Sequence, residues 1–251
     1  MKTIEKDKVI YGIHPVEELI KHRINDIENI YFDNSTAKSE LFELLKLCRS
    51  QRLPYQLIPR KNLDKISGTT KNQGIAAVCS YERYLDNDEL FSFLETLSTP
   101  GLLLLPASVE DPGNLGAIIR SAVAFGVDAI LLERKNTTSL NSTVAKTSAG
   151  MIEQMKFCKP RNLEKTIAEL IRYGYKIVGA EADAAISIRQ ADFSTPLLVI
   201  TGNEHKGIPS YLRKLCDEYI QIPIQNKVES LNVSAATSII LYEIHSQRTA
   251  K

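Results

Sequence analysis

Short apolar runs alternate with amphipathic stretches through the second half of the chain. The runs are four or five residues long and continuously apolar, which is typical of strands buried on both faces of a parallel sheet. They are Leu102–Leu105, Ala129–Leu132, Lys176–Gly179, Leu197–Thr201 and Tyr219–Ile222. Stretches with helical periodicity lie between them, at Asn114–Phe125, Asn162–Tyr173 and Pro209–Cys216. This alternation predicts an α/β domain with a parallel sheet and helices on both faces.

The first eighty residues carry a smaller version of the same alternation. Strand-like runs occur at Ile27–Phe32, Tyr55–Ile58 and Ile75–Tyr81, and helical patterns at Val16–His22 and Ser39–Arg52. The second helical pattern has an apolar stripe of Leu41, Leu44, Leu45 and Cys48, as expected of a helix that packs on a sheet. We therefore predict a small αβα domain in this part of the chain.

The pattern changes between these two regions. Asp86 is placed to cap a short helix that carries Leu90, Leu94 and Leu97, and Ser98-Thr99-Pro100-Gly101 ends it. We therefore predict an N-terminal domain at residues 1–81, a linker at 82–99 and a second domain at 100–251.

Composition limits the class of protein. The chain has 251 residues, 43% hydrophobic and 24% charged, as in a globular protein of one large or two modest domains. No apolar run has the length of a membrane span and the start lacks a signal-peptide pattern, so we expect a cytoplasmic protein without membrane contact. The four cysteines and four histidines are scattered, without CxxC or HExxH spacing, so neither disulfides nor a metal site is expected.

Basic residues gather in one stretch of the N-terminal domain, although the net charge of the chain is only +1. Seven residues between positions 46 and 71 are basic and one, Asp64, is acidic. Such a run is about as often a solvated surface as a binding site, and contact with nucleic-acid phosphates is the sharper interpretation. The basic residues are Lys46, Arg49, Arg52, Arg60, Lys61, Lys65 and Lys71.

Three polar loops follow predicted strands, at the edge where ligands bind in open parallel sheets. Residues 110–120 open a helix with Pro and Gly, residues 201–207 contain two glycines, and residues 222–234 lead from an apolar strand into an apolar helix. The glycine spacing in the second loop is like that of a phosphate-binding loop, but Ile208-Pro209 stand where that motif needs Lys and Ser or Thr. No strand is followed by GxGxxG. Nucleotide hydrolysis and dinucleotide binding are therefore both disfavoured.

Taken singly, the polar residues of these loops have simpler explanations. Ser230 or Asn232 in front of an apolar helix usually caps it, and Arg120 on a helix flank usually forms a surface ion pair. Glu204, between two glycines, is a better candidate for a polar role than its neighbour His205. The functional interpretation gains its weight from the occurrence of all three loops in one domain.

Together the loops resemble the SpoU (TrmH) family of RNA ribose 2′-O-methyltransferases, within the knotted SPOUT superfamily. The three family motifs are similar to Asn114-Leu115-Gly116-Ala117-Ile118-Ile119-Arg120, Gly202-Asn203-Glu204-His205-Lys206-Gly207 and Ser230-Leu231-Asn232-Val233-Ser234. Ser148-Ala149-Gly150 resembles a further family element, and the resemblance runs from Leu102 to about Ser246. Tyr11-Gly12-Ile13-His14-Pro15-Val16 resembles the opening of the subfamily that modifies a guanosine of large-subunit ribosomal RNA.

This resemblance implies properties that the residue pattern alone does not. The fold would be a SPOUT α/β knot, with a deep trefoil knot near the C-terminus, after an N-terminal domain like those of RNA-binding ribosomal proteins. The enzyme would transfer a methyl group from S-adenosyl-L-methionine to a ribose 2′-hydroxyl without a metal, with a guanosine of 23S rRNA as the expected target. Family members are homodimers through the knotted domain, so RNA and a second copy are the expected partners.

Carried over residue by residue, the resemblance assigns two sets of site residues. The expected catalytic residues are Asn114, Arg120, Glu204, Ser230 and Asn232. The expected cofactor-binding residues are Thr201, Gly202, Asn203, Gly207, Ile222, Ser230, Leu231 and Asn232. Because an arginine side chain stays protonated, we expect Arg120 to hold the phosphate beside the target ribose and to stabilise the developing alkoxide, across the subunit boundary of a dimer.

Two other functions stay open at this point. A tRNA 2′-O-methyltransferase would share these motifs, although that subfamily typically lacks a domain like residues 1–81. An RNA-binding protein without catalysis would be expected to have lost Arg120 or Asn232, and both are present.

Overall fold

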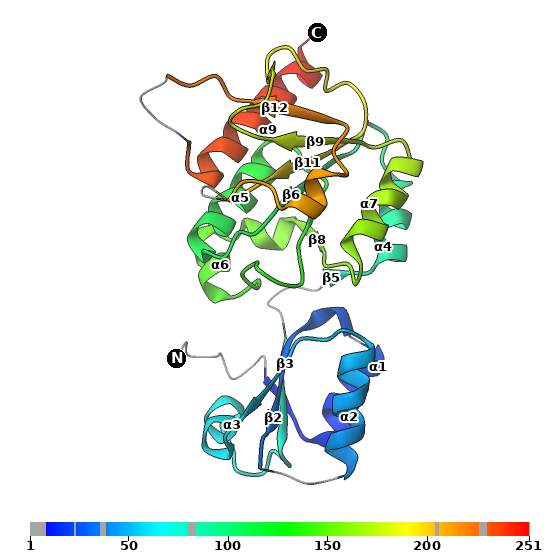
Figure 1. The fold of residues 1–251 in the computed structure, drawn as a ribbon, viewed down its shortest axis with the longest axis vertical. Coiled ribbons are helices and arrows are strands. Elements are labelled where there is room, and N and C mark those ends of the chain that lie inside the picture. The colour runs from blue at the N-terminus through cyan, green and yellow to red at the C-terminus, as the bar shows by residue number, and fades with distance from the viewer. Residues whose placement is uncertain are drawn as a thin grey trace. The chain divides into compact units, whose positions relative to one another are not determined.

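The computed structural model describes residues 9–22, 24–35, 39–79, 84–203, 206–225 and 230–250. The chain divides into two compact units, Met1–Arg83 and Tyr84–Lys251 (Figure 1). The division falls inside the stretch that we predicted as a linker, close to its N-terminal end.

The first unit contains a four-stranded sheet in the order β1-β4-β2-β3. β1 (Val9–Tyr11) and β2 (Ile27–Asp33) run antiparallel to β4 (Ile75–Cys79), and β3 (Tyr55–Ile58) runs parallel to β2. Figure 1 shows α1 (Ile13–His22) and α2 (Ser39–Ser50) on one side of the sheet and α3 (Arg60–Ser67) on the other. The unit has αβα layers, but the two predicted helices share one side and the other layer is α3, which was not predicted; β1 was not predicted either.

The sheet of the second unit has eight strands, and every pair of neighbours is parallel. The order is β10-β12-β9-β11-β6-β7-β8-β5. The strands are β5 (Tyr84–Leu85), β6 (Leu102–Pro106), β7 (Ala129–Leu131), β8 (Lys156–Cys158), β9 (Lys176–Ala180), β10 (Ile186–Ser187), β11 (Leu197–Thr201) and β12 (Glu218–Gln221). All five predicted strands are present, and the predicted parallel sheet is confirmed.

Helices cover both faces of this sheet, as the continuous apolar runs require. Within β6, Leu102 and Leu104 belong to one hydrophobic cluster and Leu103 and Leu105 to the other, because successive side chains point to opposite faces. The first cluster includes residues of α5 (Pro112–Ala124), α6 (Ser142–Thr147) and α9 (Val233–Thr249). The second includes residues of α4 (Asn87–Leu94), α7 (Leu163–Arg172) and α8 (Ser210–Arg213). Figure 1 shows α5, α6 and α9 on one side and α4 and α7 on the other.

Residues 84–97 are part of the second unit, which corrects the predicted linker. β5 pairs with β8, and α4 buries Leu90 and Leu94 in the second core cluster. The predicted cap is present, since Asp86 accepts from Glu89 N at 2.8 Å and the Glu89 carboxylate accepts from Asp86 N at 3.0 Å. The local pattern revealed the helix, but its packing partners lie much later in the chain.

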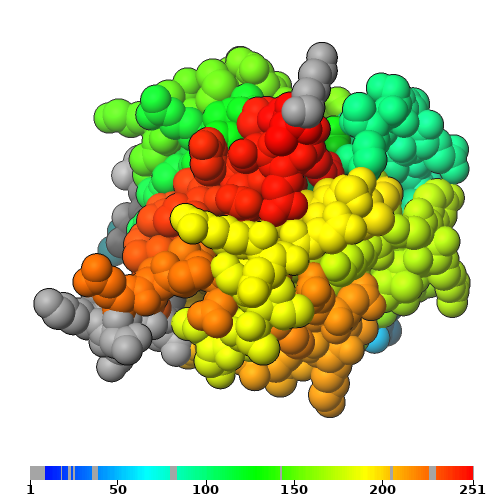
Figure 2. All heavy atoms as spheres, turned by 90° about the horizontal axis from the view of Figure 1, so that it is seen from above, coloured from blue at the N-terminus to red at the C-terminus, as the bar shows by residue number. Residues whose placement is uncertain are grey.

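α9, the last helix, is fixed at its C-terminal end by Arg248. The Arg248 guanidinium donates to the carbonyl oxygens of Phe193 at 2.9 Å, Thr195 at 2.7 Å and Pro100 at 2.6 Å. Figure 2 shows α9, in red, lying along the yellow stretch that leads to β11. The expected trefoil knot in this region stays a prediction. Within the described ranges, none of the helices has the length and apolar character needed to cross a membrane.

Leu170 and Ile171 are neighbours on α7 with different surroundings, since Leu170 is fully buried and Ile171 is 42% exposed. We expect Leu170→Ala to lower the free energy of unfolding by about 2–5 kcal/mol, because it removes buried methyl groups and leaves a cavity. Ile171→Ala, the matched control, should cost about 1 kcal/mol or less. Urea unfolding followed by circular dichroism measures both, and equal losses would contradict this packing of α7.

Candidate functional site

The register of three central strands sets the position of the site. β11 lies between β9 and β6, and Thr201 is opposite Ala180 on one side and Pro106 on the other. Because the three strands run in the same direction, the loops that follow them leave the sheet side by side. Ala107 N donates to Thr201 O at 2.8 Å, which holds the start of the first loop against the end of β11.

A cavity of about 460 Å³ lies at this edge of the sheet. Its volume is within the usual range for a site that binds a small molecule. The lining mixes charged and apolar side chains. The charged residues are Glu181, Asp183, Lys206 and Arg213, and the larger apolar residues are Ile220, Ile222, Ile224, Leu231, Val233 and Ile240.

The loop after β11 folds tightly on itself. Gly207 N donates to Asn203 O at 2.9 Å, and these two residues form an isolated β-bridge. A Cβ atom on Gly202 would overlap the backbone of Gly207 and Ile208, so the turn requires glycine at this position. The Asn203 side-chain amide donates to Ser108 O at 3.4 Å and so links this loop to the loop after β6.

Two asparagines join the first turns of α5 and α9. Asn232 Nδ2 donates to Asn114 Oδ1 at 3.0 Å, across loops that are 118 residues apart in sequence. Asn232 Oδ1 also caps α9, accepting from Ser234 N at 3.0 Å and from the Ser234 hydroxyl at 2.6 Å. The simple interpretation of Asn232 as a helix cap is therefore correct, and the same side chain also makes the contact between motifs.

Small hydroxyl residues hold α9 against its neighbours. The Ser121 and Ser238 hydroxyls are 2.7 Å apart and connect α5 with α9. The Thr237 hydroxyl donates to Thr201 Oγ1 at 3.2 Å and fixes α9 to the end of β11. These contacts place the N-terminal turn of α9 beside the loops that leave β6 and β11.

The structure brings most of the expected site residues to one place. Seven of the eight expected cofactor residues line the cavity, and the eighth, Asn232, contacts Asn114. The seven are Thr201, Gly202, Asn203, Gly207, Ile222, Ser230 and Leu231. Glu204 lies outside the described residues.

Arg120 is exposed on α5, about 9 Å along the helix axis from Asn114 at 1.5 Å per residue. Gly116, four residues before Arg120, is a small residue that could have left room around the guanidinium. Instead Gly116 is buried, and a Cβ atom on it would overlap the Thr147 side chain of α6. Gly116 therefore permits close packing of α5 against α6, and it does not leave space beside Arg120.

Comparison with known families identifies the chemistry of this site. Residues 101–242 match the model of the SpoU rRNA Methylase family, and residues 9–85 match a model described as RNA 2′-O ribose methyltransferase substrate binding. The chain belongs to the SpoU rRNA methylase family. The expected family, fold class and enzyme class are therefore confirmed, and the protein is an RNA methyltransferase.

Relatives of this SpoU methylase match nearly the whole chain. A 23S rRNA (guanosine-2′-O-)-methyltransferase RlmB of Coxiella burnetii is 35% identical and aligns over 98% of both chains. A protein of Staphylococcus haemolyticus, named as a TrmH family tRNA/rRNA methyltransferase, is 35% identical over 97% of both chains. Among solved structures, the SpoU methyltransferase AviRb from Streptomyces viridochromogenes, in complex with AdoMet, has a TM-score of 0.59 at 23% identity. That match covers 96% of this chain and 90% of AviRb, and it shows a shared fold.

The sequence analysis missed a buried carboxylate behind the site of this methylase. Glu133 is 6% exposed and accepts from Ser108 N at 2.5 Å and from the Tyr211 hydroxyl at 2.5 Å. Burial and the contact with Glu133 raise the pKa of Tyr211, so its hydroxyl stays a donor. Since the Ser108 carbonyl binds Asn203, Glu133 supports the contact between the first two motif loops. The signal in the sequence was an acidic residue directly after an apolar strand.

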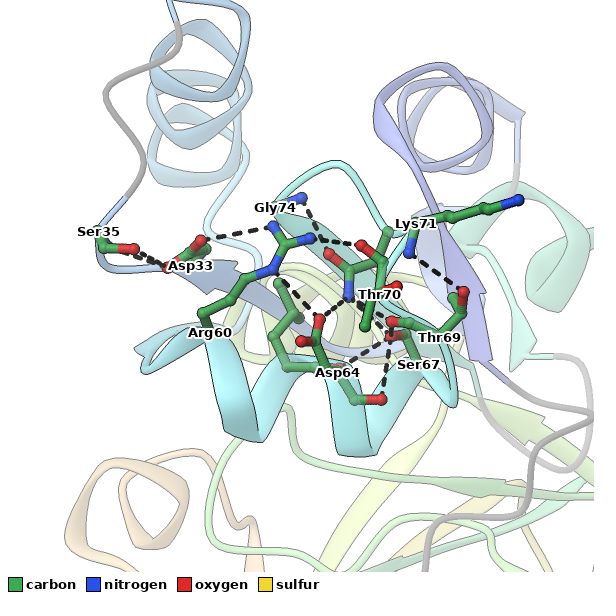
Figure 3. Close-up of polar contacts among 11 residues, drawn as sticks. Asp33, Ser35, Arg60, Asp64, Ser67, Thr69, Thr70, Lys71 and Gly74 are labelled. Carbon is green, nitrogen blue, oxygen red and sulfur yellow. Dashed lines mark hydrogen bonds and ion pairs between the residues drawn. The ribbon is translucent and has the colours of Figure 1, made fainter.

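The basic stretch of the first unit separates into paired and unpaired cations. Figure 3 shows Arg60 directed at Asp33 and Asp64, with N–O distances of 3.5 Å and 3.2 Å, and donating to Thr70 O at 2.7 Å. Asn72 Nδ2 donates to Asp64 Oδ1 at 2.8 Å and completes this network. Arg60 therefore stabilises the segment around α3, which is a correction to its expected place in a phosphate-binding patch.

Two more cations of this stretch have partners within the first unit. Lys46 lies 2.9 Å from Glu43, and Arg49 donates to the Tyr55 hydroxyl at 2.9 Å. The remaining four, Arg52, Lys61, Lys65 and Lys71, are exposed. The predicted patch thus reduces to four cations, of which three lie on α3 and the loop that follows it.

We expect Tyr211→Phe to lower the free energy of unfolding by about 1–3 kcal/mol, because it removes a hydrogen-bond donor from the buried Glu133 carboxylate. Tyr173→Phe is the matched control, since Tyr173 is 50% exposed and its hydroxyl contacts the exposed Glu95 carboxylate, where water can replace the lost bond. The control should change stability by about 0.5 kcal/mol or less. Urea unfolding at neutral pH measures both variants. A Tyr211→Phe protein as stable as the control would exclude a supporting role for this contact.

Proposed function

We propose that this SpoU methyltransferase transfers a methyl group from S-adenosyl-L-methionine to the ribose 2′-hydroxyl of a guanosine in 23S ribosomal RNA. The observation that carries the proposal is one cavity lined by the second and third motif loops, beside the hydrogen bond that joins Asn114 to Asn232. The relative named as a 23S rRNA (guanosine-2′-O-)-methyltransferase, which aligns over 98% of this chain, supports the choice of RNA and base.

A ribosomal target is favoured over transfer RNA by the extent of the matches. The structure of the A. aeolicus TrmH/SpoU tRNA modifying enzyme matches only 64% of this chain and 82% of its own chain. The sequence identity is 27% and the TM-score is 0.53. The relative named as a 23S rRNA methyltransferase aligns over 98% of the chain and therefore includes both units. A ribosomal RNA target agrees with the expected cytoplasmic location, which stays a prediction.

The residues around the cavity fit the methyl donor. Ile222 and Leu231 offer apolar surface to an adenine ring, and the missing side chain at Gly202 lets the backbone of its loop approach a ligand closely. Thr201, Asn203, Gly207 and Ser230 would complete the contacts. S-adenosylmethionine supplies a methyl group that its sulfonium already activates, so a metal is not needed.

The chain's own residues then have to orient a ribose and remove one proton. The mutual hydrogen bond of Asn114 and Asn232 restrains both side chains, and with Ser230 they orient the ribose beside the cavity. The guanidinium of Arg120, acting across the subunit boundary, binds the phosphate next to that ribose and stabilises the alkoxide as it develops. The proton leaves through the phosphate or water, and Glu204 helps to orient these groups.

We place the interface of a homodimer on the exposed side of α9. Ile239 is 39% exposed and Tyr242 58% exposed, and the Tyr242 ring meets the Phe125 ring edge-on at 5.9 Å between centroids. Exposed apolar residues grouped on one face favour burial against a partner. Because α9 packs on α5, a second copy bound there would lie close to α5, and Arg120 would act across the interface.

The first unit binds RNA through Lys61, Lys65 and Lys71 in this proposal. Lys61 and Lys65 are one helical turn apart on α3, and both are exposed. Figure 3 shows the Lys71 side chain directed away from the Arg60 network. Within the part of the chain that the structure describes, these three exposed lysines form no ion pair, and such cations suit contact with the phosphates of an RNA strand.

Arg120→Ala should lower kcat by about 100-fold or more, because a preorganised positive charge is lost where negative charge develops. Arg120→Lys should also be strongly impaired, since an ammonium cannot reproduce the fork of a guanidinium. Arg172→Lys, at an exposed position on α7, is the control and should keep normal activity. Transfer of labelled methyl groups to 23S rRNA measures kcat, and near-normal activity of Arg120→Lys would contradict the need for a forked donor.

Replacing Lys61, Lys65 and Lys71 together by Ala should weaken RNA binding and reduce the slope of log affinity against log salt by about 2. Binding of S-adenosylmethionine should not change. Lys46→Ala is the control, because Lys46 is already paired with Glu43. Fluorescence anisotropy with an rRNA fragment between 50 and 200 mM salt, roughly the range over which phosphate contacts are lost, measures the slope. An unchanged slope in the triple variant would mean that these three lysines form a solvated surface and do not contact RNA phosphates.

A further inference from the structure

One charged pair in the cavity has no role in the proposed function. Glu181 follows the last residue of β9, and Arg213 is the last residue of α8. Both line the cavity, and Arg213 Nη2 lies 2.6 Å from Glu181 Oε1. Neither residue belongs to the family motifs that the sequence analysis identified.

The Glu181 carboxylate is buried with part of its hydrogen-bonding capacity unused. Its side chain is only 10% exposed, while the Arg213 side chain is 52% exposed. Glu181 Oε1 is fully covered, and within the described part of the chain no donor reaches it with hydrogen-bond geometry. A carboxylate offers about four lone-pair sites on two oxygens, so with Oε1 covered beside Arg213 the other oxygen, Oε2, is the one that can accept from a ligand.

The ion pair selects the kind of donor that Glu181 can accept. The Arg213 guanidinium already balances the charge of the carboxylate, and it would repel a second cation such as an ammonium group. Neutral hydroxyl groups meet no such repulsion. A ribose offers two neighbouring hydroxyls, and either can donate to Oε2, as to the acidic residue that binds ribose in dinucleotide folds.

Glu181 lies at the end of β9, where the ribose of a bound methyl donor would be expected to lie. β9 and β6 are separated by β11, so at about 4.8 Å per strand Glu181 lies on the order of 10 Å from the loop that leads to Asn114. Glu181 N donates to Ile220 O at 3.0 Å, which sets its side chain beside the apolar lining from β12 and the segment after it. An adenine on this apolar surface would bring its ribose to Glu181 and leave the sulfonium on the side of the Asn114–Asn232 pair.

We propose that Glu181, held in place by Arg213, accepts hydrogen bonds from the ribose hydroxyls of S-adenosylmethionine and is a specificity residue for the adenosine part of the cofactor. This inference rests on the proposed function, because it requires that cofactor in this cavity. It adds a charged side chain to a site whose other expected contacts are apolar side chains, small polar residues and the backbone at Gly202.

Calorimetry with S-adenosylhomocysteine and its 2′-deoxy and 3′-deoxy analogues tests the contact on the full chain. Wild-type protein should bind at least one deoxy analogue about 10- to 100-fold more weakly than the intact ligand, as expected for a lost hydrogen bond to a charged group. Glu181→Ala should bind the intact ligand more weakly by a similar factor and should no longer distinguish the analogues. Glu181→Gln keeps the shape and one acceptor oxygen, so its affinity for the intact ligand should lie between those of wild type and Glu181→Ala. It replaces the alanine variant in the test if that variant does not fold.

Glu164→Ala is the control, since Glu164 is exposed on α7 and is not among the residues that line the cavity, and it should keep the full discrimination of wild type. A Glu181 variant that still discriminates as wild type does would overturn the inference, and so would a wild type that binds all three ligands alike. 5′-Methylthioadenosine, which lacks the amino-acid part, should lose as much affinity on Glu181→Ala as S-adenosylhomocysteine does. A loss confined to ligands with an ammonium group would assign Glu181 to that group instead. A wild type that binds no S-adenosylhomocysteine would contradict the proposed function as well.

Discussion

The parallel pairing of β11 with β9 and β6 is the constraint on which the rest of the site depends. It aligns Ala180, Thr201 and Pro106 at one edge of the sheet, so that three loops begin from the same level. The cavity is lined by segments between Ala180 and Ile240, and the loop after β6 reaches them through the Asn203–Ser108 and Asn232–Asn114 contacts. A shift of β11 by one residue would exchange its core faces and would also separate these loops, because alternate side chains of the strand are buried in different clusters.

Polar side chains then fix the loops that the sheet has brought together. Asn232 caps α9 through its Oδ1 atom and donates to Asn114 through its Nδ2 atom, so one side chain both starts a helix and links two motifs. Asn203 and Ser108 make the corresponding link between the loop after β11 and the loop after β6, with Glu133 buried behind it. Such restraint matters for methyl transfer, because the donor is already activated and the main task of the protein is alignment.

The central part of the fold was predictable because the apolar runs that form its strands can be recognised from a few consecutive residues. The five central strands are continuous apolar runs, and a run buried on both faces has the same appearance wherever its partners lie. By contrast, β5, β8 and β10 have only two or three residues each and carry no periodicity. α3 was missed because it has only two buried residues, Leu63 and Ser67, and its segment is held by the polar network of Arg60. The pairing of Arg60 and the place of Glu181 in the cavity depend on partners distant in the chain, so no local pattern shows them.

The most direct test of the account is a crystal structure of the protein with S-adenosylhomocysteine bound. The account predicts the ligand in the cavity between the loop that begins at Gly202 and the segment from Ser230 to Leu231, with its sulfur on the side of Asn114 and Asn232. The adenosine should then lie against Ile222 and Leu231. A ligand bound at another surface, or bound here with its sulfur turned away from the two asparagines, would contradict the account.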